Sequence, residues 1–305
     1  MAKVETLGLV LHPTRDVTSV VSAVLGWSAD HGVAVRVGAA DADRAAGARA
    51  VPEDELAGSD AILSIGGDGT MLGALRLVSD DPRPVLGVNM GKLGFLVEIE
   101  PPELVTALDR LAAGDVTLEH HSCLRVTSGD SSRMAFNDLA LSRRPGDGTV
   151  NAILTIDDQQ YGYFRADAVI MATATGSTAH SYSAGGPLLS PVTDAVVITP
   201  VAPMSGISRP LVLGAGERVE FSLLSDVGRP VIEADGQVLG ELEPGRTVRA
   251  ELRRDAGLVV RLDVRRHRQR SQAKLSLLDL PLLPDQLREL LPPQVRDQLA
   301  RRESP

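Results

Sequence analysis

Two glycine-rich segments contain the residues best suited to chemistry. The first is GGDGT at residues 66–70, which follows the apolar run at 60–65 and precedes a helical stretch. Glycines let backbone N–H groups approach an anion closely, and the N-terminus of the following helix adds a dipole that favours phosphate. A carboxylate repels such a ligand, so Asp68 needs a separate role. It either holds Mg²⁺ or accepts the proton of an attacking hydroxyl.

Other phosphate-binding and nucleophile motifs do not fit this segment. A G-x-G-x-x-G motif needs glycine at position 72, which is Leu72. The chain has no G-x-x-x-x-G-K-[ST], G-x-S-x-G or H-E-x-x-H motif and no paired C-x-x-C. The competing interpretation of GGDGT is a tight strand-to-helix turn with Asp68 as the helix N-cap.

The second segment is TATGSTAH at 173–180, followed by SAGGP at 183–187. Small hydroxylated residues beside glycine suit the close approach of a polar ligand, because they offer many adaptable donors and acceptors. The alternative is a flexible Ser/Thr-rich loop. Tyr182 and the exit into Pro187-Leu188-Leu189 favour an ordered segment.

The first third of the chain alternates strands with helices, as expected around a mostly parallel sheet. Asp16 is a candidate N-cap for a helix with Val17, Val20, Val21, Val24 and Leu25 on one face. Pro near the start of 52–56 suggests a short helix. The predicted strands are 7–11, 34–37, 60–65 and 84–88, and further helices are predicted at 70–78 and 101–113.

From about residue 120, short β-like runs recur, many separated by turn pairs such as Gly129-Asp130 and Asp157-Asp158. This spacing is typical of a β-sandwich-like domain. The predicted runs are 122–127, 133–142, 150–156, 160–164, 167–172, 195–199, 217–224, 229–234, 247–253 and 257–263.

The predicted domains are therefore an α/β nucleotide-binding domain at 1–119, an all-β sandwich-like domain at 120–263 and a helical tail at 264–305. In the tail, one helix is predicted with Leu283, Leu287, Leu290 and Leu291 on one face, and Val295 and Leu299 suggest a second. We expect the tail to pack back on the first domain; the alternative is an oligomer contact.

Composition narrows the class of protein. The net charge of −9 argues against nucleic acid or an anionic membrane as the main partner. The basic run 265–270 lacks aromatic partners and is better interpreted as a solvated edge or local anion contact. Cys123 is the only cysteine and lies in an alternating run, which predicts a core residue rather than a nucleophile. With no apolar run of membrane-spanning length and no signal-like N-terminus, we expect a cytoplasmic protein.

Five segments together resemble the NAD kinase family. They are GGDGTML at 66–72, NMGKLGFL at 89–96, FNDLALSR at 136–143, TATGSTAHSYSAGGP at 173–187 and SRPLVL at 208–213. GGDGT alone is shared with diacylglycerol and sphingosine kinases, whereas the glycine-serine-threonine segment at this distance after an Asn-acid pair is highly specific. The resemblance covers residues from about 6 to 265. It implies a two-domain fold, α/β followed by a β-sandwich, with NAD bound between the domains.

The resemblance also implies roles for individual residues. Asp68 would be the general base on the adenosine 2′-hydroxyl of NAD, with ATP and Mg²⁺ as phosphoryl donor and cation. Asp235 would match an acidic residue near the nicotinamide end, although a hairpin turn at Asp235-Gly236 is a competing interpretation. The donor phosphates would contact Gly66, Gly67, Gly69 and Thr70, and the dinucleotide would contact Asn137, Asp138, Asp167, Thr175, Thr178, Ala179, His180 and Ser183.

The chain departs from the family pattern at four positions. It has Ala174 in place of proline, His180 in place of tyrosine, Ala168 in place of glycine and Met204 in place of histidine. A non-catalytic or substrate-shifted NAD(P)-binding paralogue is therefore the alternative to an NAD kinase. A lipid kinase is less favoured, because residues 173–183 are rich in hydroxyls. Family members often form homodimers or homotetramers, and some use polyphosphate as donor.

Overall fold

The computed structural model describes residues 3–91, 94–224 and 228–269 of the 305-residue chain. These residues form two compact units. Unit 1 consists of the described parts of Met1–Leu77, Arg83–Glu119 and Leu258–Pro305, and unit 2 of those of Val78–Pro82 and His120–Gly257. The division at 119/120 and 263/264 stays a prediction, and the tail helices predicted around 283–299 lie outside the described residues.

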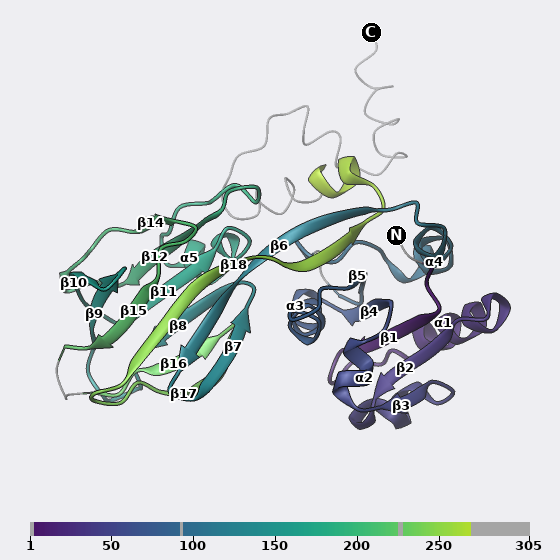
Figure 1. Ribbon diagram of the computed structural model, residues 1–305, viewed down its shortest axis with the longest axis horizontal. Helices are drawn as coiled ribbons and strands as arrows, with labels where there is room; N and C mark the ends of the chain where they lie inside the picture. The colour runs from purple at the N-terminus through teal and green to yellow at the C-terminus, as the bar shows by residue number, and fades with distance from the viewer. Residues whose placement is uncertain (1–2, 92–93, 225–227, 270–305) are drawn as a thin grey trace, which may run out of the picture. The chain divides into compact units, whose positions relative to one another are not determined.

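Unit 1 is built on a parallel sheet, as the alternation of strands and helices predicts. The strand order is β3-β2-β1-β4-β5, followed by the end of β18, and every pair in this series is parallel (Figure 1). Its strands are β1 Thr6–Leu11, β2 Ala34–Gly38, β3 Arg49–Val51, β4 Ala61–Gly66, β5 Pro84–Asn89 and the last residues of β18 Thr247–Arg261.

Helices cover both faces of this sheet. Leu7, Leu9 and Leu11 of β1 belong to a core cluster that also contains apolar residues of α1 and α4. Between them, Gly8 approaches Leu56 of α2 instead, because neighbouring strand residues face opposite sides. The helices are α1 Thr18–His31, α2 Glu53–Ala57, α3 Asp68–Leu77 and α4 Leu104–Ala113, with 3₁₀ turns η1 Ala39–Ala45 and η2 Pro101–Glu103.

The predicted starts of α1 and α3 are off by one or two residues, and the helix predicted at 101–113 begins with the 3₁₀ turn η2 before α4 starts at Leu104. The N-cap of α1 is Val17, so the assignment of Asp16 to that position was wrong. Asp16 nonetheless accepts a hydrogen bond from the backbone N–H of Thr18 at 2.9 Å, which satisfies one donor of the first turn. Helix α3 begins at Asp68 rather than at Thr70.

Unit 2 contains two antiparallel layers, which confirms the sandwich prediction. One is the series β13-β10-β9-β15-β18, with β6 pairing β18 and β7; the other is β14-β12-β11-β8-β16-β17. Side chains from both layers share one core cluster, including Leu154 and Phe221 from the first and Leu141 and Met171 from the second. The remaining bounds are β6 Thr117–Ser128, β7 Ser131–Ala135, β8 Asp138–Ser142, β9 Val150–Ile156, β10 Gln159–Ala166, β11 Ala168–Thr173, η3 Gly176–Thr178, α5 His180–Ser183, β12 Ala195–Val201, β13 Ser205–Gly206, β14 Leu211–Gly214, β15 Val219–Leu223, β16 Val231–Ala234 and β17 Gln237–Glu241.

Strand boundaries in unit 2 differ from the prediction in several places: β6 begins at Thr117 rather than at residue 122, and β13, β14 and β17 were not predicted. The run predicted at 133–142 is two strands, interrupted at Phe136-Asn137, and the runs at 247–253 and 257–263 form the single strand β18. The predicted turns at 129–130 and 157–158 are present. Cys123 is fully buried, and burial raises the pKa of its thiol to about 12, so it is a core residue as predicted.

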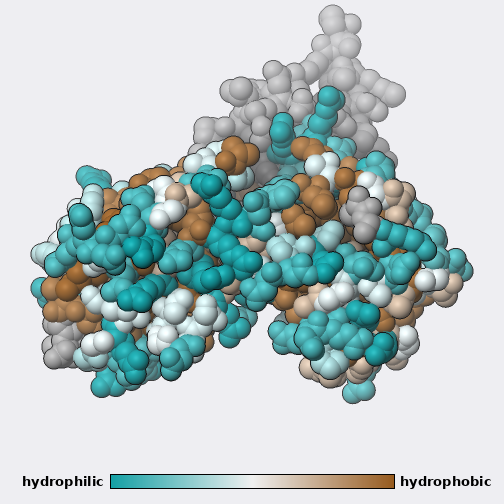
Figure 2. Space-filling model, viewed as in Figure 1, coloured by the Kyte–Doolittle hydropathy of each residue, from teal (hydrophilic) through white to brown (hydrophobic). Residues whose placement is uncertain are grey.

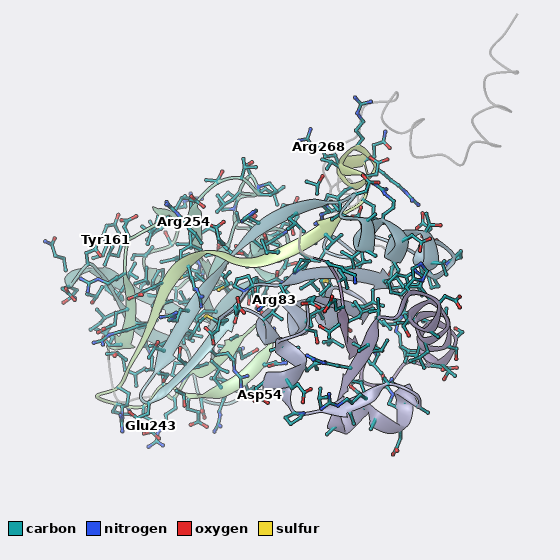
Figure 3. All side chains as sticks on the ribbon, turned by 45° about the vertical axis from the view of Figure 1, so that its right-hand side comes forward. Asp54, Arg83, Tyr161, Glu243, Arg254 and Arg268 are labelled. Atoms are coloured by element: carbon teal, nitrogen blue, oxygen red, sulfur yellow. The ribbon has the colours of Figure 1, made fainter. Side chains whose placement is uncertain are left out.

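Polar side chains dominate much of the face shown in Figure 2, with apolar patches between them. In Figure 3 the exposed charged residues Asp54, Glu243 and Arg268 lie at the surface, as does Tyr161 of β10, which is 61% exposed. No helix in the described ranges is long and apolar enough to cross a bilayer.

Candidate functional site

The GGDGT segment lies where β4 ends and α3 begins, at the carboxyl edge of the parallel sheet. Thr70 is buried, whereas Gly67 and Gly69 have open space where a side chain would lie. The carbonyl of Gly66 accepts a hydrogen bond from the N–H of Met90 at 2.8 Å. The backbone at Gly67 and Gly69 is thus accessible at the place where α/β proteins bind ligands.

Asp68 is held by a loop distant in sequence. Its Oδ2 accepts the backbone N–H of Phe95 at 2.8 Å, and its Oδ1 accepts that of Leu96 at 3.0 Å. A Cβ at Gly94 would lie 2.3 Å from Oδ1, so only glycine allows this approach. Asp68 is the first residue of α3, and the alternative that placed it as the N-cap was therefore wrong in position.

In unit 2, Asp235 lies in the hairpin turn that was the competing interpretation of this residue. Asp235 and Gly236 have φ of 47° and 73° and form the hairpin turn between β16 and β17. The Asp235 carboxylate also accepts the backbone N–H groups of Phe136, Asn137 and Asp138, at 3.0, 2.7 and 3.3 Å. The turn therefore places an acidic side chain directly against the Asn-Asp pair.

The Asn-Asp pair also contacts the Ser/Thr segment. The carbonyl of Asn137 accepts the N–H of Thr173 at 2.9 Å, and the Thr173 hydroxyl donates to the Phe136 carbonyl at 2.7 Å. A Cβ at Gly176 would lie 1.9 Å from the Asn137 carbonyl oxygen, so this approach requires glycine. The structure thus brings together Asn137, Asp138, Asp235 and the start of the 173–183 segment.

Asp138 is an acidic residue in an unfavourable position for charge. It is 6% exposed, and burial, followed by the charges of Asp235 and Glu233, raises the pKa of its carboxyl to about 7. A carboxyl with this pKa is protonated in a large fraction of the molecules near neutral pH, and in that form it can donate as well as accept a hydrogen bond.

Hydrogen bonds order the Ser/Thr segment, so the flexible-loop alternative is wrong. Ser177 donates to the Ala174 carbonyl at 2.6 Å and accepts the N–H of Leu189 at 3.0 Å. Ser181 is buried and bonds the hydroxyl of Thr199 at 2.9 Å. These two hydroxyls hold the segment in place and are not available to a ligand.

The hydroxyls of the predicted site lie nearer the surface. Thr175 and Thr178 are half-buried, and Ser183 is exposed. Thr175 Oγ1 lies 3.1 Å from Nδ1 of the buried His121, a contact that no sequence motif indicated. Ala179 is half-buried and His180 is exposed, so His180 does not fill space in the core of unit 2.

Asp167 stands apart from this group. Its carboxylate pairs with Arg143 at 2.7 Å, and its backbone bonds Arg143 and Val201. Within the described residues it makes no hydrogen bond or ion pair with the Asn-Asp pair or with residues 173–183. Arg143 lies at the end of the quoted segment 136–143, but nothing in the sequence indicated its pairing with Asp167.

The chain is similar to known kinases along most of its length. Residues 14–116 match the ATP-NAD kinase N-terminal domain, and residues 136–259 match the ATP-NAD kinase C-terminal domain. The NAD kinase of Chlorobium phaeobacteroides is 32% identical over 247 residues, which cover 79% of this chain and 86% of that protein.

Two solved structures share the fold. Yeast NADH kinase complexed with NADH matches with a TM-score of 0.81 at 23% identity, covering 93% of this chain and 90% of that chain. An NAD kinase from Archaeoglobus fulgidus in complex with ATP matches with a TM-score of 0.69 at 21% identity, covering 90% of this chain and 98% of that chain. The predicted two-domain fold is confirmed.

Proposed function

The chain belongs to the ATP-NAD kinase family, and on that premise we propose that it transfers the γ-phosphoryl group of ATP to the adenosine 2′-hydroxyl of NAD, giving NADP. The observation that carries the proposal is the Asp68 carboxylate, held by two loop N–H groups at the start of α3, beside the accessible backbone of Gly67 and Gly69. A fixed carboxylate next to anion-binding backbone matches what phosphoryl transfer to a hydroxyl requires.

In the proposed reaction, the 2′-oxygen of NAD forms a bond to the γ-phosphorus while the bond from that phosphorus to the β–γ bridging oxygen breaks and ADP leaves. Asp68 accepts the hydroxyl proton. The donor phosphates are bound by the backbone at the GGDGT segment (Gly66, Gly67, Gly69 and Thr70), where the N-terminus of α3 favours negative charge.

We propose that Mg²⁺ enters as part of the MgATP substrate, where it neutralises phosphate charge. No group of three or more His, Cys, Asp or Glu side chains in the described part of the chain is arranged to hold a metal ion. Mg²⁺ in nucleotide sites commonly binds largely through the substrate phosphates, so the ATP phosphates would supply much of its coordination.

For NAD we propose binding by residues of unit 2. The contacts that join Asn137, Asp138 and Asp235 to residues 173–176 support this assignment. Thr175, Thr178, Ala179, His180, Ser183 and Asp167 complete the proposed set. The replacements at Ala168 and Ala174 are buried and small, whereas Met204 is 64% exposed, so the changed surface lies chiefly at His180 and Met204.

The test is purified full-length protein with NAD, ATP and Mg²⁺, with NADP detected by an NADP-specific dehydrogenase. We expect NADP formation and no phosphoryl transfer to diacylglycerol or sphingoid bases. Nucleotide binding without turnover with ATP or polyphosphate would instead support the non-catalytic alternative, which the family matches over both regions do not favour.

We propose that the enzyme acts in the cytoplasm as a homodimer or homotetramer. The single, buried cysteine suits a reducing compartment, since the chain forms no internal disulfide. Light scattering coupled to size-exclusion chromatography tests the assembly: a mass of 32.2 kDa would identify a monomer and contradict it.

A further inference from the structure

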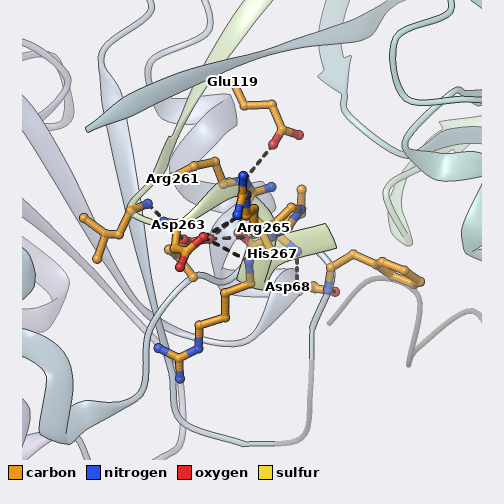
Figure 4. Close-up of polar contacts among 11 residues, drawn as sticks. Asp68, Glu119, Arg261, Asp263, Arg265 and His267 are labelled. Carbon is orange, nitrogen blue, oxygen red and sulfur yellow. Dashed lines mark hydrogen bonds and ion pairs between the residues drawn. The ribbon is translucent and has the colours of Figure 1, made fainter. Parts of the chain in front are cut away.

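The loop that binds Asp68 is held from its other side by a buried arginine. Arg261 Nη1 donates to the carbonyl of Leu96 at 2.9 Å, while the N–H of the same Leu96 donates to Asp68 (Figure 4). Both contacts lie within unit 1. The two peptide groups that flank the Leu96 Cα are therefore fixed by two different side chains.

Arg261 is itself fixed by two acidic residues. Its Nε donates to Glu119 at 2.6 Å, and its Nη1 lies 3.3 Å from Glu98. Arg261 is 2% exposed and Glu98 6%. Burial favours a raised pKa for Glu98, but the hydrogen bond from His267, the charge of Arg261 and the N–H groups of Leu262 and Asp263 together hold its pKa below the ordinary value.

Packing alone does not require this arginine. A buried ion pair is weak evidence for stability, because an apolar side chain of similar size often serves as well at lower desolvation cost. What an apolar side chain cannot do is donate to the Leu96 carbonyl while bound to two carboxylates. The guanidinium has several donors in a rigid plane, so it can join Glu98, Glu119 and Leu96 at once.

We propose that Arg261 is a positioning residue for Asp68. By holding the Leu96 carbonyl, it keeps the N–H groups of Phe95 and Leu96 directed at the carboxylate that accepts the proton. The inference deepens the proposed function and rests on it for the role of Asp68. It assigns no substrate contact to Arg261.

The first test compares Arg261→Lys and Arg261→Met with Arg110→Met. Arg110 is a matched control, because it donates to the carbonyl of Leu262 at 3.0 Å and, within the described chain, makes no hydrogen bond or ion pair with residues 94–96. We expect the Arg261 variants to lose kcat on the order of 10-fold, with KM for NAD and ATP within about 2-fold, since a displaced catalytic group affects the chemical step. Arg110→Met should retain wild-type kcat.

Arg261→Met leaves Glu98 and Glu119 buried without their cation and is expected to unfold more easily. The triple variant Arg261→Met, Glu98→Gln, Glu119→Gln removes all three charges together. If Arg261→Met alone does not fold, kcat is measured on the triple variant instead. In an Asp68→Asn background, the Arg261 substitution should add no further loss of kcat, because residues that act as a unit are not additive. A full additional 10-fold loss would overturn the proposal.

A second readout is independent of activity. Amide hydrogen exchange of Phe95 and Leu96 should be faster in Arg261→Lys than in wild type or Arg110→Met. Unchanged exchange at these amides would overturn the positioning role even if activity fell. If wild-type protein forms no NADP but exchange at 95–96 depends on Arg261, the proposed function fails and the structural coupling stands.

Discussion

The carboxylate of Asp235 lies 2.7 Å from the backbone nitrogen of Asn137, although nearly a hundred residues separate them in the chain. This contact explains why the run at 133–142 is two strands. The N–H groups of Phe136, Asn137 and Asp138 bond the carboxylate, and the backbone leaves the strand where they do so.

We expect Asp235→Asn to destabilise the protein by on the order of 1–3 kcal/mol, because the amide replaces one acceptor oxygen by a donor facing backbone donors. Asparagine tolerates a positive φ, so the turn itself is retained. Asp157→Asn is a matched control with the same φ of 47° and an exposed hydrogen bond to Arg218. Urea unfolding measures the free energy of unfolding of both variants. An equal loss of stability in Asp235→Asn and Asp157→Asn would contradict the special role of Asp235.

Asp138→Asn should stabilise the protein at pH 8 and much less at pH 4.5. Burial and the charges of Asp235 and Glu233 raise the folded-state pKa of Asp138 to about 7, whereas the unfolded value is 3.8. The stability this group contributes is fully present below the unfolded pKa and is lost as pH rises through the folded pKa. Asparagine does not ionise and escapes this loss, on the order of a few kcal/mol. Thermal unfolding of wild type and Asp138→Asn at the two pH values measures the difference in stability. An equal gain in stability at pH 4.5 and pH 8 would refute the prediction.

Gly176→Ala should destabilise unit 2 and weaken NAD binding together. Its Cβ would lie 1.9 Å from the Asn137 carbonyl oxygen, and relieving that overlap displaces backbone at a cost of about 1–3 kcal/mol. Gly26→Ala is the control, because that helical glycine is exposed and has open space around it, so the change should be neutral or slightly stabilising. Calorimetry of unfolding and NAD titration provide the readouts. A Gly176→Ala protein as stable as wild type would contradict the close approach.

Asp68→Asn should lower kcat by on the order of 10²-fold or more, because the amide retains the shape but cannot accept the proton. The fold and the KM for NAD should change little, with one of the two loop hydrogen bonds lost. Steady-state kinetics of NADP formation decide this. A kcat within a few-fold of wild type would remove Asp68 from the role of base.

Local patterns predicted most of the helices and strands, because their signals lie within a few residues, although the short strands β3, β13, β14 and β17 were missed. Strand β4, the glycine turn and α3 follow from an apolar run, glycines and helical spacing. In contrast, residues 254–256 separate the two strands predicted at 247–253 and 257–263, but they lie inside β18, in and beside the charged stretch 253–255. Its side chains are paired with distant residues: Arg253 with Asp80, Arg254 with Asp194 and Asp255 with His120.

The contacts that organise the site are also long-range. Phe95 and Leu96 bind Asp68 through their backbone N–H groups. Because every non-proline residue has such a group, the identity of the side chains at 95 and 96 could not predict this contact. Likewise, the sequence DG at 235–236 indicates a turn but not what its carboxylate binds. Sequence therefore identified Asp68 and Asp235 as candidates, while their partners required the folded chain.

The long strand β18 has a consequence for synthesis on the ribosome. Its residues Leu258 and Val259 pair with Pro84 and Val85 of β5, so the sheet of unit 1 gains its last strand only after all of unit 2 has been translated. Until then β5, with Val85, Leu86 and Val88 fully buried in the finished protein, is an edge strand. A nascent chain halted near residue 119 would carry an unprotected apolar edge and should recruit chaperones. A gene truncated at that point would yield an aggregation-prone fragment rather than a free nucleotide-binding module.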